Sequence, residues 1–210
     1  MIKQYVELIK TKTNLIAESI LEIGSRDGHD ANFFKESFNI CPRNVFIVEP
    51  NPSQAKKIKE TYAEYNLFEV AIFNESKEMD FYEVYDEHID PIGISSLKQR
   101  NDDWYERFKT RKIKVSAITG KELLDKIASP IQICKVDVEG ATYEVLESLG
   151  ENIKLIDSFH LETERAQFWK DQKLHEDICE YMKSKGYVIL WSDDAYPQTD
   201  TIWIKPEYII

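Results

Sequence analysis

Acidic residues and one histidine lie near the ends of two apolar runs in the second half of the chain, and such residues can take up protons or bind a metal. Asp137 follows residues 131–136, and His160 and Glu162 end residues 155–162. Side chains two apart on a strand share a face, so His160 and Glu162 are both expected to face the crevice that Asp137 faces. His160 is the predicted general base, because an imidazole pKa of ~6.5 suits proton uptake near neutrality, with Asp137 or Glu162 orienting it.

Two other interpretations of these residues stay open. A histidine in an apolar strand is alternatively a hydrogen-bonded core residue with no catalytic role. The carboxylates of Asp137, Glu139 and Glu162 are alternatively the oxygen ligands of Mg²⁺, which would bind a substrate oxygen and lower its pKa. Loss of activity with a chelator would indicate the metal.

A glycine turn earlier in the chain predicts a cofactor site. The apolar run at residues 20–23 ends in Gly24-Ser25-Arg26-Asp27-Gly28, and apolar residues on helical spacing follow. A helix that begins at such a turn presents N–H groups, and glycines let a ligand approach the backbone. Two glycines do not make the three-glycine fingerprint of a dinucleotide site, so the turn favours a cofactor without a pyrophosphate. The alternative is a tight turn that binds nothing.

A carboxylate at the end of the next predicted strand strengthens the cofactor interpretation. Residues 45–48 are apolar and lead into Glu49-Pro50-Asn51. In a parallel β-α-β unit this position reaches the ribose of an adenosine, because a carboxylate can accept hydrogen bonds from both vicinal hydroxyls. A solvated acid at a strand end is the alternative.

Alternating strands and helices must bring these residues together, and they predict one α/β domain over residues 1–210 with parallel strands and right-handed crossovers. Two successive strands at the end predict an antiparallel edge. The expected strands are residues 20–23, 45–48, 68–72, 112–118, 131–136, 155–162, 187–191 and 201–204, and the main helices are residues 2–9, 52–62, 121–128, 141–149 and 174–185.

The pattern is looser between residues 74 and 115. A hairpin is expected around residues 79–85, followed by a polar turn that contains Ser95 and Ser96, the next candidates if the acids and the histidine are not catalytic. A helix is expected over three aromatic side chains, and it is either local core or a wall of the substrate site. Those aromatic residues are Trp104, Tyr105 and Phe108.

The composition limits the classes of partner. With 27 Lys and Arg against 38 Asp and Glu, the formal charge of -11 disfavours nucleic acid and anionic lipid surfaces. The 3 cysteines are far apart in the sequence, so no disulfide framework or zinc site is expected. There is no signal-peptide pattern and no apolar run long enough to span a bilayer, so we expect a cytoplasmic protein without membrane insertion.

Several strings resemble the FkbM family of S-adenosylmethionine-dependent methyltransferases over residues 21–162. They are LEIGSRDG, FIVEPNP, EVAIF, GISSL, KVDVEGATYEVLESLG and FHLETE. The resemblance implies a class I methyltransferase fold, a Rossmann-like three-layer sandwich with a seven-stranded, mainly parallel sheet whose last strand is antiparallel. It also implies methylation of sugar or polyketide hydroxyls with S-adenosylmethionine.

The resemblance also assigns roles to single residues. The family's glycine-rich turn would correspond to Glu22, Gly24, Ser25 and Gly28. Arg26 stands where the family has a small residue, and it would pair with the cofactor carboxylate or with a neighbouring acid. The remaining predicted cofactor contacts are Glu49 on the ribose, Ala71 beside the adenine, and Asp137 near the sulfonium or ammonium group, with Asn51 as a further cofactor-binding residue.

The leading hypothesis is therefore an O-methyltransferase that acts on a sugar or glycan hydroxyl. Trp104, Tyr105 and Trp169 are expected to cover the apolar face of the sugar, or are alternatively part of the core. A polyketide-like small molecule is the alternative acceptor, and the acidic charge disfavours RNA. A nicotinamide-dependent oxidoreductase is a competing class, but the third glycine and a Tyr-x-x-x-Lys proton relay are missing. A binding module that keeps the fold without chemistry is a third class.

Overall fold

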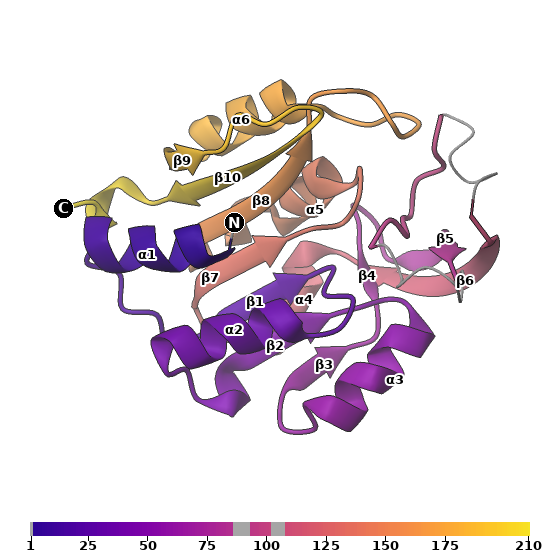
Figure 1. The fold of residues 1–210 in the computed structure, drawn as a ribbon, viewed down its shortest axis with the longest axis horizontal. Coiled ribbons are helices and arrows are strands. Elements are labelled where there is room, and N and C mark those ends of the chain that lie inside the picture. Colours follow the sequence, from indigo (N-terminus) through magenta and orange to yellow (C-terminus); the bar gives the residue numbers. More distant parts are fainter. Residues whose placement is uncertain (1, 86–92, 102–107) are drawn as a thin grey trace.

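The computed structural model describes residues 2–85, 93–101 and 108–210, and a twisted seven-stranded sheet forms its centre (Figure 1). The strand order is β3-β2-β1-β7-β8-β10-β9, and β10 alone runs antiparallel to its neighbours. This confirms the predicted sheet. The strands are β1 (Ile20–Ile23), β2 (Val45–Val48), β3 (Asn66–Phe68), β7 (Ile131–Val136), β8 (Ile156–Glu164), β9 (Val188–Ser192) and β10 (Gln198–Ile204).

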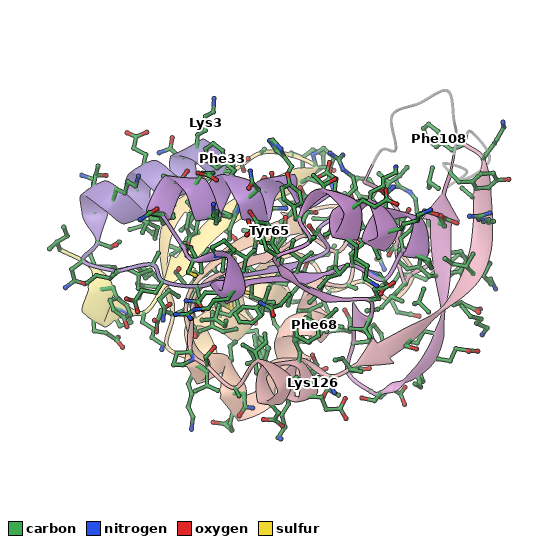
Figure 2. All side chains as sticks on the ribbon, turned by 90° about the horizontal axis from the view of Figure 1, so that it is seen from below. Lys3, Phe33, Tyr65, Phe68, Phe108 and Lys126 are labelled. Atoms are coloured by element: carbon green, nitrogen blue, oxygen red, sulfur yellow. The ribbon has the colours of Figure 1, made fainter. Side chains whose placement is uncertain are left out.

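Helices cover both faces of this sheet, because the side chains of each central strand alternate between two apolar cores. On β1, Ile20 belongs to one core and Leu21 to the other. The first core is closed by α1 (Ile2–Lys12), α2 (His29–Phe38) and α3 (Pro52–Thr61), and the second by α4 (Gly120–Ile127), α5 (Thr142–Leu149) and α6 (His175–Ser184). Lys3 on α1 and Lys126 on α4 mark the two outer layers in Figure 2. Short 3-10 turns lie at Pro42–Asn44, Gly150–Leu155 and Pro206–Tyr208.

A second, three-stranded sheet lies beside the carboxyl ends of the central strands. It consists of β4 (Ala71–Ile72), β6 (Thr110–Ile118) and β5 (Lys77–Val84), in the order β4-β6-β5. It corrects two predictions. Residues 68–72 are not one strand, because the chain leaves the central sheet at Phe68 and joins the second sheet at Ala71. Residues 79–85 are not a hairpin, because β5 pairs antiparallel with the distant β6.

The predicted aromatic helix falls largely outside the described residues, since only Phe108 of its three aromatic side chains is described. Among the helices that the structure describes, none combines the length and the apolar character needed to cross a bilayer.

The order of the central strands creates a crevice at one point. From β1, the chain adds β2 and β3 on one side and the later strands β7 and β8 on the other. The loops after β1 and β7 therefore leave in opposite directions, and α/β proteins bind ligands at such a point. Gly24, Glu49 and Asp137, which follow β1, β2 and β7, meet there.

Candidate functional site

The glycine turn after β1 is in contact with the end of β7. Gly24 has a φ of +81°, and a Cβ atom there would lie 1.9 Å from the carbonyl oxygen of Asp137. Only glycine tolerates both the left-handed backbone and this approach. The turn and Asp137 are thus held together by backbone packing.

Two of the first three N–H groups of α2 are occupied by the protein's own acids, contrary to the expectation that these groups are free for a ligand. Ala31 donates its N–H to Glu22 Oε2 at 3.1 Å, and His29 donates to Asp27 Oδ1 at 3.0 Å. Burial raises the pKa of Glu22 to about 8, against the lowering effect of Lys135. The Asp27 carboxylate beside the turn would repel a pyrophosphate, so the turn suits a cofactor without phosphates.

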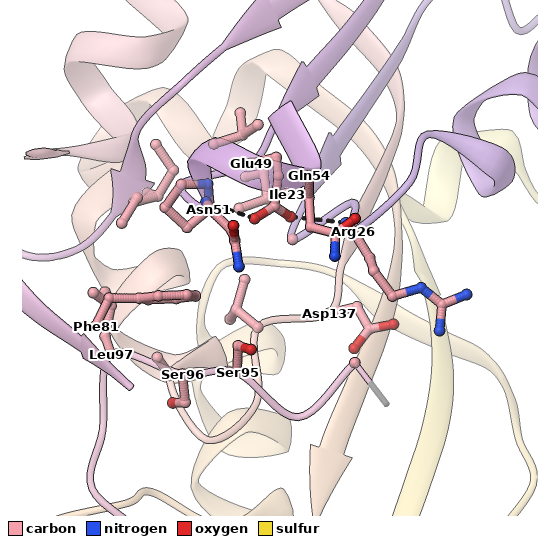
Figure 3. A pocket seen from close by; sticks show the side chains of 18 of the residues that line it. Ile23, Arg26, Glu49, Asn51, Gln54, Phe81, Ser95, Ser96, Leu97 and Asp137 are labelled. Carbon is pink, nitrogen blue, oxygen red and sulfur yellow. Dashed lines mark hydrogen bonds between the residues drawn. The ribbon is translucent and has the colours of Figure 1, made fainter. Parts of the chain in front are cut away.

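Glu49 is held from both sides by backbone donors. The N–H of Arg26 donates to Oε2 and the N–H of Asn51 donates to Oε1, both at 2.8 Å (Figure 3). The residue is 5% exposed, and burial raises its pKa to about 7 while the two N–H donors lower it. A carboxylate oxygen has two lone pairs, so each oxygen retains one acceptor site for a ligand.

A cavity that is open to solvent lies between the crevice and the second sheet (Figure 3). Its lining combines the polar side chains of Glu49, Asn51 and Asp137 with apolar side chains that include Ala71 and Phe81. This combination suits a flat base and its ribose. Six of the predicted cofactor residues line the cavity: Gly24, Arg26, Glu49, Asn51, Ala71 and Asp137. Glu22, Ser25 and Gly28 do not line it.

A second open cavity adjoins the first at Arg26 and Asp137. It contains the buried ammonium group of Lys135. The sequence did not indicate a role for Lys135 in the site, because a lysine inside an apolar run has no feature that distinguishes it from other strand residues. The partners of Lys135 Nζ are Asp137 at 2.8 Å, Asp30 at 3.1 Å and Glu22 at 3.7 Å. Burial opposes the charge of Lys135, but these carboxylates outweigh it and raise its pKa. The ammonium fixes Asp137 at the junction of the two cavities.

The three predicted metal ligands lie close together. Carboxylate oxygens of Asp137, Glu139 and Glu162 lie within 4.8 Å of one another. Burial, followed by the charge of Asp137, raises the pKa of Glu162 to about 9, and burial with Glu162 raises that of Glu139. Three oxygen ligands around one space fit a hard divalent cation, whose charge would favour the ionised forms.

His160 is not placed to act as the general base. It is 3% exposed, its Nε2 lies 2.7 Å from Asp200 Oδ1, and its ring packs near Tyr5. Neither cavity, as lined by the described residues, includes it. His160 lies two residues before Glu162 on β8, so it is further from the carboxyl end of the strand and from the crevice. The geometry supports the alternative of a core histidine.

The other candidate residues have structural partners. Ser96 donates to the Glu139 carbonyl at 2.6 Å, and Ser95 accepts the Val84 N–H at 3.1 Å, although both line the first cavity. Trp169 is fully buried, and its indole packs so closely on Gly140 that a Cβ atom there would lie 2.3 Å away. Trp169 is therefore part of the core and is not free to stack on a sugar.

Comparison with known proteins identifies the family. The model of the methyltransferase FkbM domain matches residues 22–189, which is most of the chain. The chain belongs to the FkbM methyltransferase family. A search among curated proteins returned no match.

Solved structures share the fold of this FkbM methyltransferase at low identity. An FkbM methyltransferase from Methylobacillus flagellatus superposes with a TM-score of 0.58 at 10% identity, over 90% of this chain but only 43% of its own. A magnesium protoporphyrin IX methyltransferase from Synechocystis with bound S-adenosylmethionine gives 0.54 at 10% identity, over 97% and 77%. A ribosomal protein L11 methylase from Lactobacillus delbrueckii gives 0.54 at 7%, over 97% and 78%.

The site of this FkbM methyltransferase fits the family's cofactor, S-adenosylmethionine. The cofactor has no phosphate, and it carries a sulfonium and an ammonium group. The carboxylates around the glycine turn, among them Asp27, Asp30 and Asp137, favour positive charge. Arg26 lines both cavities, and its guanidinium is suited to pair with a cofactor carboxylate.

Proposed function

We propose that this FkbM methyltransferase transfers the methyl group of S-adenosylmethionine to a hydroxyl of a sugar or glycan. The observation that supports O-methylation is the carboxylate cluster of Asp137, Glu139 and Glu162, which adjoins the cofactor cavity at Asp137. An alcohol is a poor nucleophile until a base or a metal helps to remove its proton, and such groups must lie beside the transferable methyl.

The cofactor is proposed to lie across the ends of β1, β2 and β7. Glu49 accepts the ribose hydroxyls, the adenine lies against Ala71, and the methionine end passes Gly24 toward Asp137. The support for this placement is that these residues all line one cavity and include both polar and apolar side chains. Binding in this orientation would align the methyl group with an acceptor near Asp137 for in-line transfer.

Asp137 is the proposed proton acceptor, in place of His160, which is buried. It lines both cavities, and Lys135 holds its carboxylate at 2.8 Å. A divalent cation such as Mg²⁺ is proposed to be held by Asp137, Glu139 and Glu162, and a bound cation would lower the pKa of the acceptor hydroxyl. In that case Asp137 acts as a ligand and positions the acceptor.

The sugar acceptor is supported by the family resemblance and by the acidic charge of -11, which disfavours nucleic acid. A polyketide-like small molecule has the same reacting group and is the second candidate. Because the buried Trp169 cannot stack on a sugar ring, recognition must use other side chains.

The test is methyl transfer from labelled S-adenosylmethionine to a panel of sugars, glycans, polyketides and RNA, each with EDTA or Mg²⁺. Uptake by a carbohydrate is expected, and uptake only by polyketides or RNA would refute the acceptor class. EDTA-sensitive activity that Mg²⁺ restores supports the metal. Activity that survives EDTA but falls at least about a hundredfold in Asp137→Asn supports Asp137 as the base.

A further inference from the structure

A buried carboxylate on the second sheet contacts the ribose-binding loop of the central sheet. Glu83 on β5 is 3% exposed. Its Oε1 accepts a hydrogen bond from the side-chain Nδ2 of Asn51 at 3.0 Å, and its Oε2 accepts from the guanidinium of Arg111. A buried carboxylate is costly unless its partners satisfy it, so this arrangement ties residues from two sheets together.

Asn51 transmits this contact to Glu49. Its backbone N–H donates to Glu49 Oε1 at 2.8 Å, and its side-chain Oδ1 accepts the Ser53 N–H at 2.9 Å, which caps α3. An Asn amide has a donor end and an acceptor end. Because a carboxylate only accepts, Glu83 forces the NH₂ end of Asn51 toward itself and leaves the carbonyl end for Ser53.

The same strand also forms part of the cavity wall. Phe81, two residues before Glu83 on β5, and Val84, the residue after it, line the cofactor cavity, and Figure 3 shows Phe81 across the cavity from Glu49. One strand thus supplies a wall of the cavity and, through Glu83, the orientation of the loop that carries its carboxylate.

We propose that Glu83 is a positioning residue of the cofactor site, which fixes Asn51 and thereby the ribose-binding carboxylate of Glu49. This inference rests on the proposed contact between Glu49 and the ribose. If Glu83 has this role, the second sheet contributes to cofactor binding by positioning Glu49, and Arg111 holds the Glu83 carboxylate from the outer side.

The sharpest perturbation is Glu83→Gln, which keeps the size of the side chain but removes its charge and gives it a donor. The Gln amide can rotate and present its NH₂ group to Asn51, so the loop loses its single orientation. We expect the Kd for S-adenosylhomocysteine to rise about three- to tenfold. The matched control is Asp80→Asn on the same strand, which removes a carboxylate that pairs with Lys112 and Lys114 and does not line the cavity.

Calorimetry with S-adenosylhomocysteine on the full chain tests the proposal in a double-mutant cycle with Glu49→Ala. Positioning predicts a weaker Kd in Glu83→Gln, a Kd within about twofold of wild type in Asp80→Asn, and little added effect of Glu83→Gln when Glu49 is already Ala. Wild-type affinity in Glu83→Gln would overturn the proposal. An undiminished effect in the Glu49→Ala background would also overturn it, because Glu83 would then act elsewhere.

Two further measurements keep the outcome decisive. If Glu83→Gln does not fold, as judged by its thermal unfolding, Glu83→Asp keeps the charge near Arg111 but withdraws it from Asn51, and it should weaken binding; wild-type affinity would refute the proposal. If Glu49→Ala itself binds like wild type, the ribose assignment fails. That result is distinct from a failure of the Glu83 proposal alone, in which Glu49→Ala would bind S-adenosylhomocysteine weakly and Glu83→Gln would bind it with wild-type affinity.

Discussion

Replacing Glu49 should weaken cofactor binding by the loss of a charged hydrogen-bond partner. Both carboxylate oxygens accept a backbone N–H at 2.8 Å, so the group is already in place before a ligand arrives. Removing a charged hydrogen-bond partner costs ~1.5–3 kcal/mol, which corresponds to about one to two decades in Kd for Glu49→Ala.

Glu49→Gln should restore little of this affinity. A Gln amide must direct its NH₂ group toward one of two backbone N–H donors, either that of Arg26 or that of Asn51, and two donors cannot bond to each other. Glu69→Gln, a change at an exposed acid paired with Lys59, is the control and should bind normally. Calorimetry with S-adenosylhomocysteine measures all three variants. A Kd for Glu49→Gln within about twofold of wild type would refute the reasoning.

Three further predictions follow from packing and burial. Gly24→Ala should abolish cofactor binding and lower the Tm, because the new Cβ would overlap the Asp137 carbonyl; a Tm equal to that of wild type would contradict this. Burial raises the pKa of Glu22 from 4.5 to about 8, so the folded chain binds more protons than the unfolded chain between these pH values. The free energy of unfolding should therefore fall as the pH rises from about 5 to 8. Urea titrations across this range should show that fall. His160→Gln should lower the Tm but leave methyl transfer within about threefold of wild type, since a group acting as a base typically contributes ~10²–10⁴-fold; a hundredfold loss of turnover in a folded variant would return His160 to the active site.

The central strands and the position of the site follow from local sequence signals. The apolar runs before Gly24, Glu49 and Asp137 each end in a residue that breaks the pattern, and parallel strands bring their carboxyl ends to one edge. These signals are local, so single-sequence reasoning detects them.

The parts that could not be predicted depend on partners distant in the sequence. One such part is the pairing of β5 with β6, on which the role of Glu83 depends. The two strands are separated by a stretch of sequence in which the apolar residues have no regular spacing. Alternation along β8 gives the face of His160 but not its distance from the strand end, and register with β7 places it beside Lys135. Lys135 itself is recognisable only when the acids around it are known.

A crystal structure with bound S-adenosylhomocysteine tests the central claim most directly. We expect the ribose hydroxyls within hydrogen-bond distance of Glu49, the adenine between Ala71 and Phe81, and the sulfur near Asp137. A nucleoside bound elsewhere, or a ribose turned away from Glu49, would contradict the account.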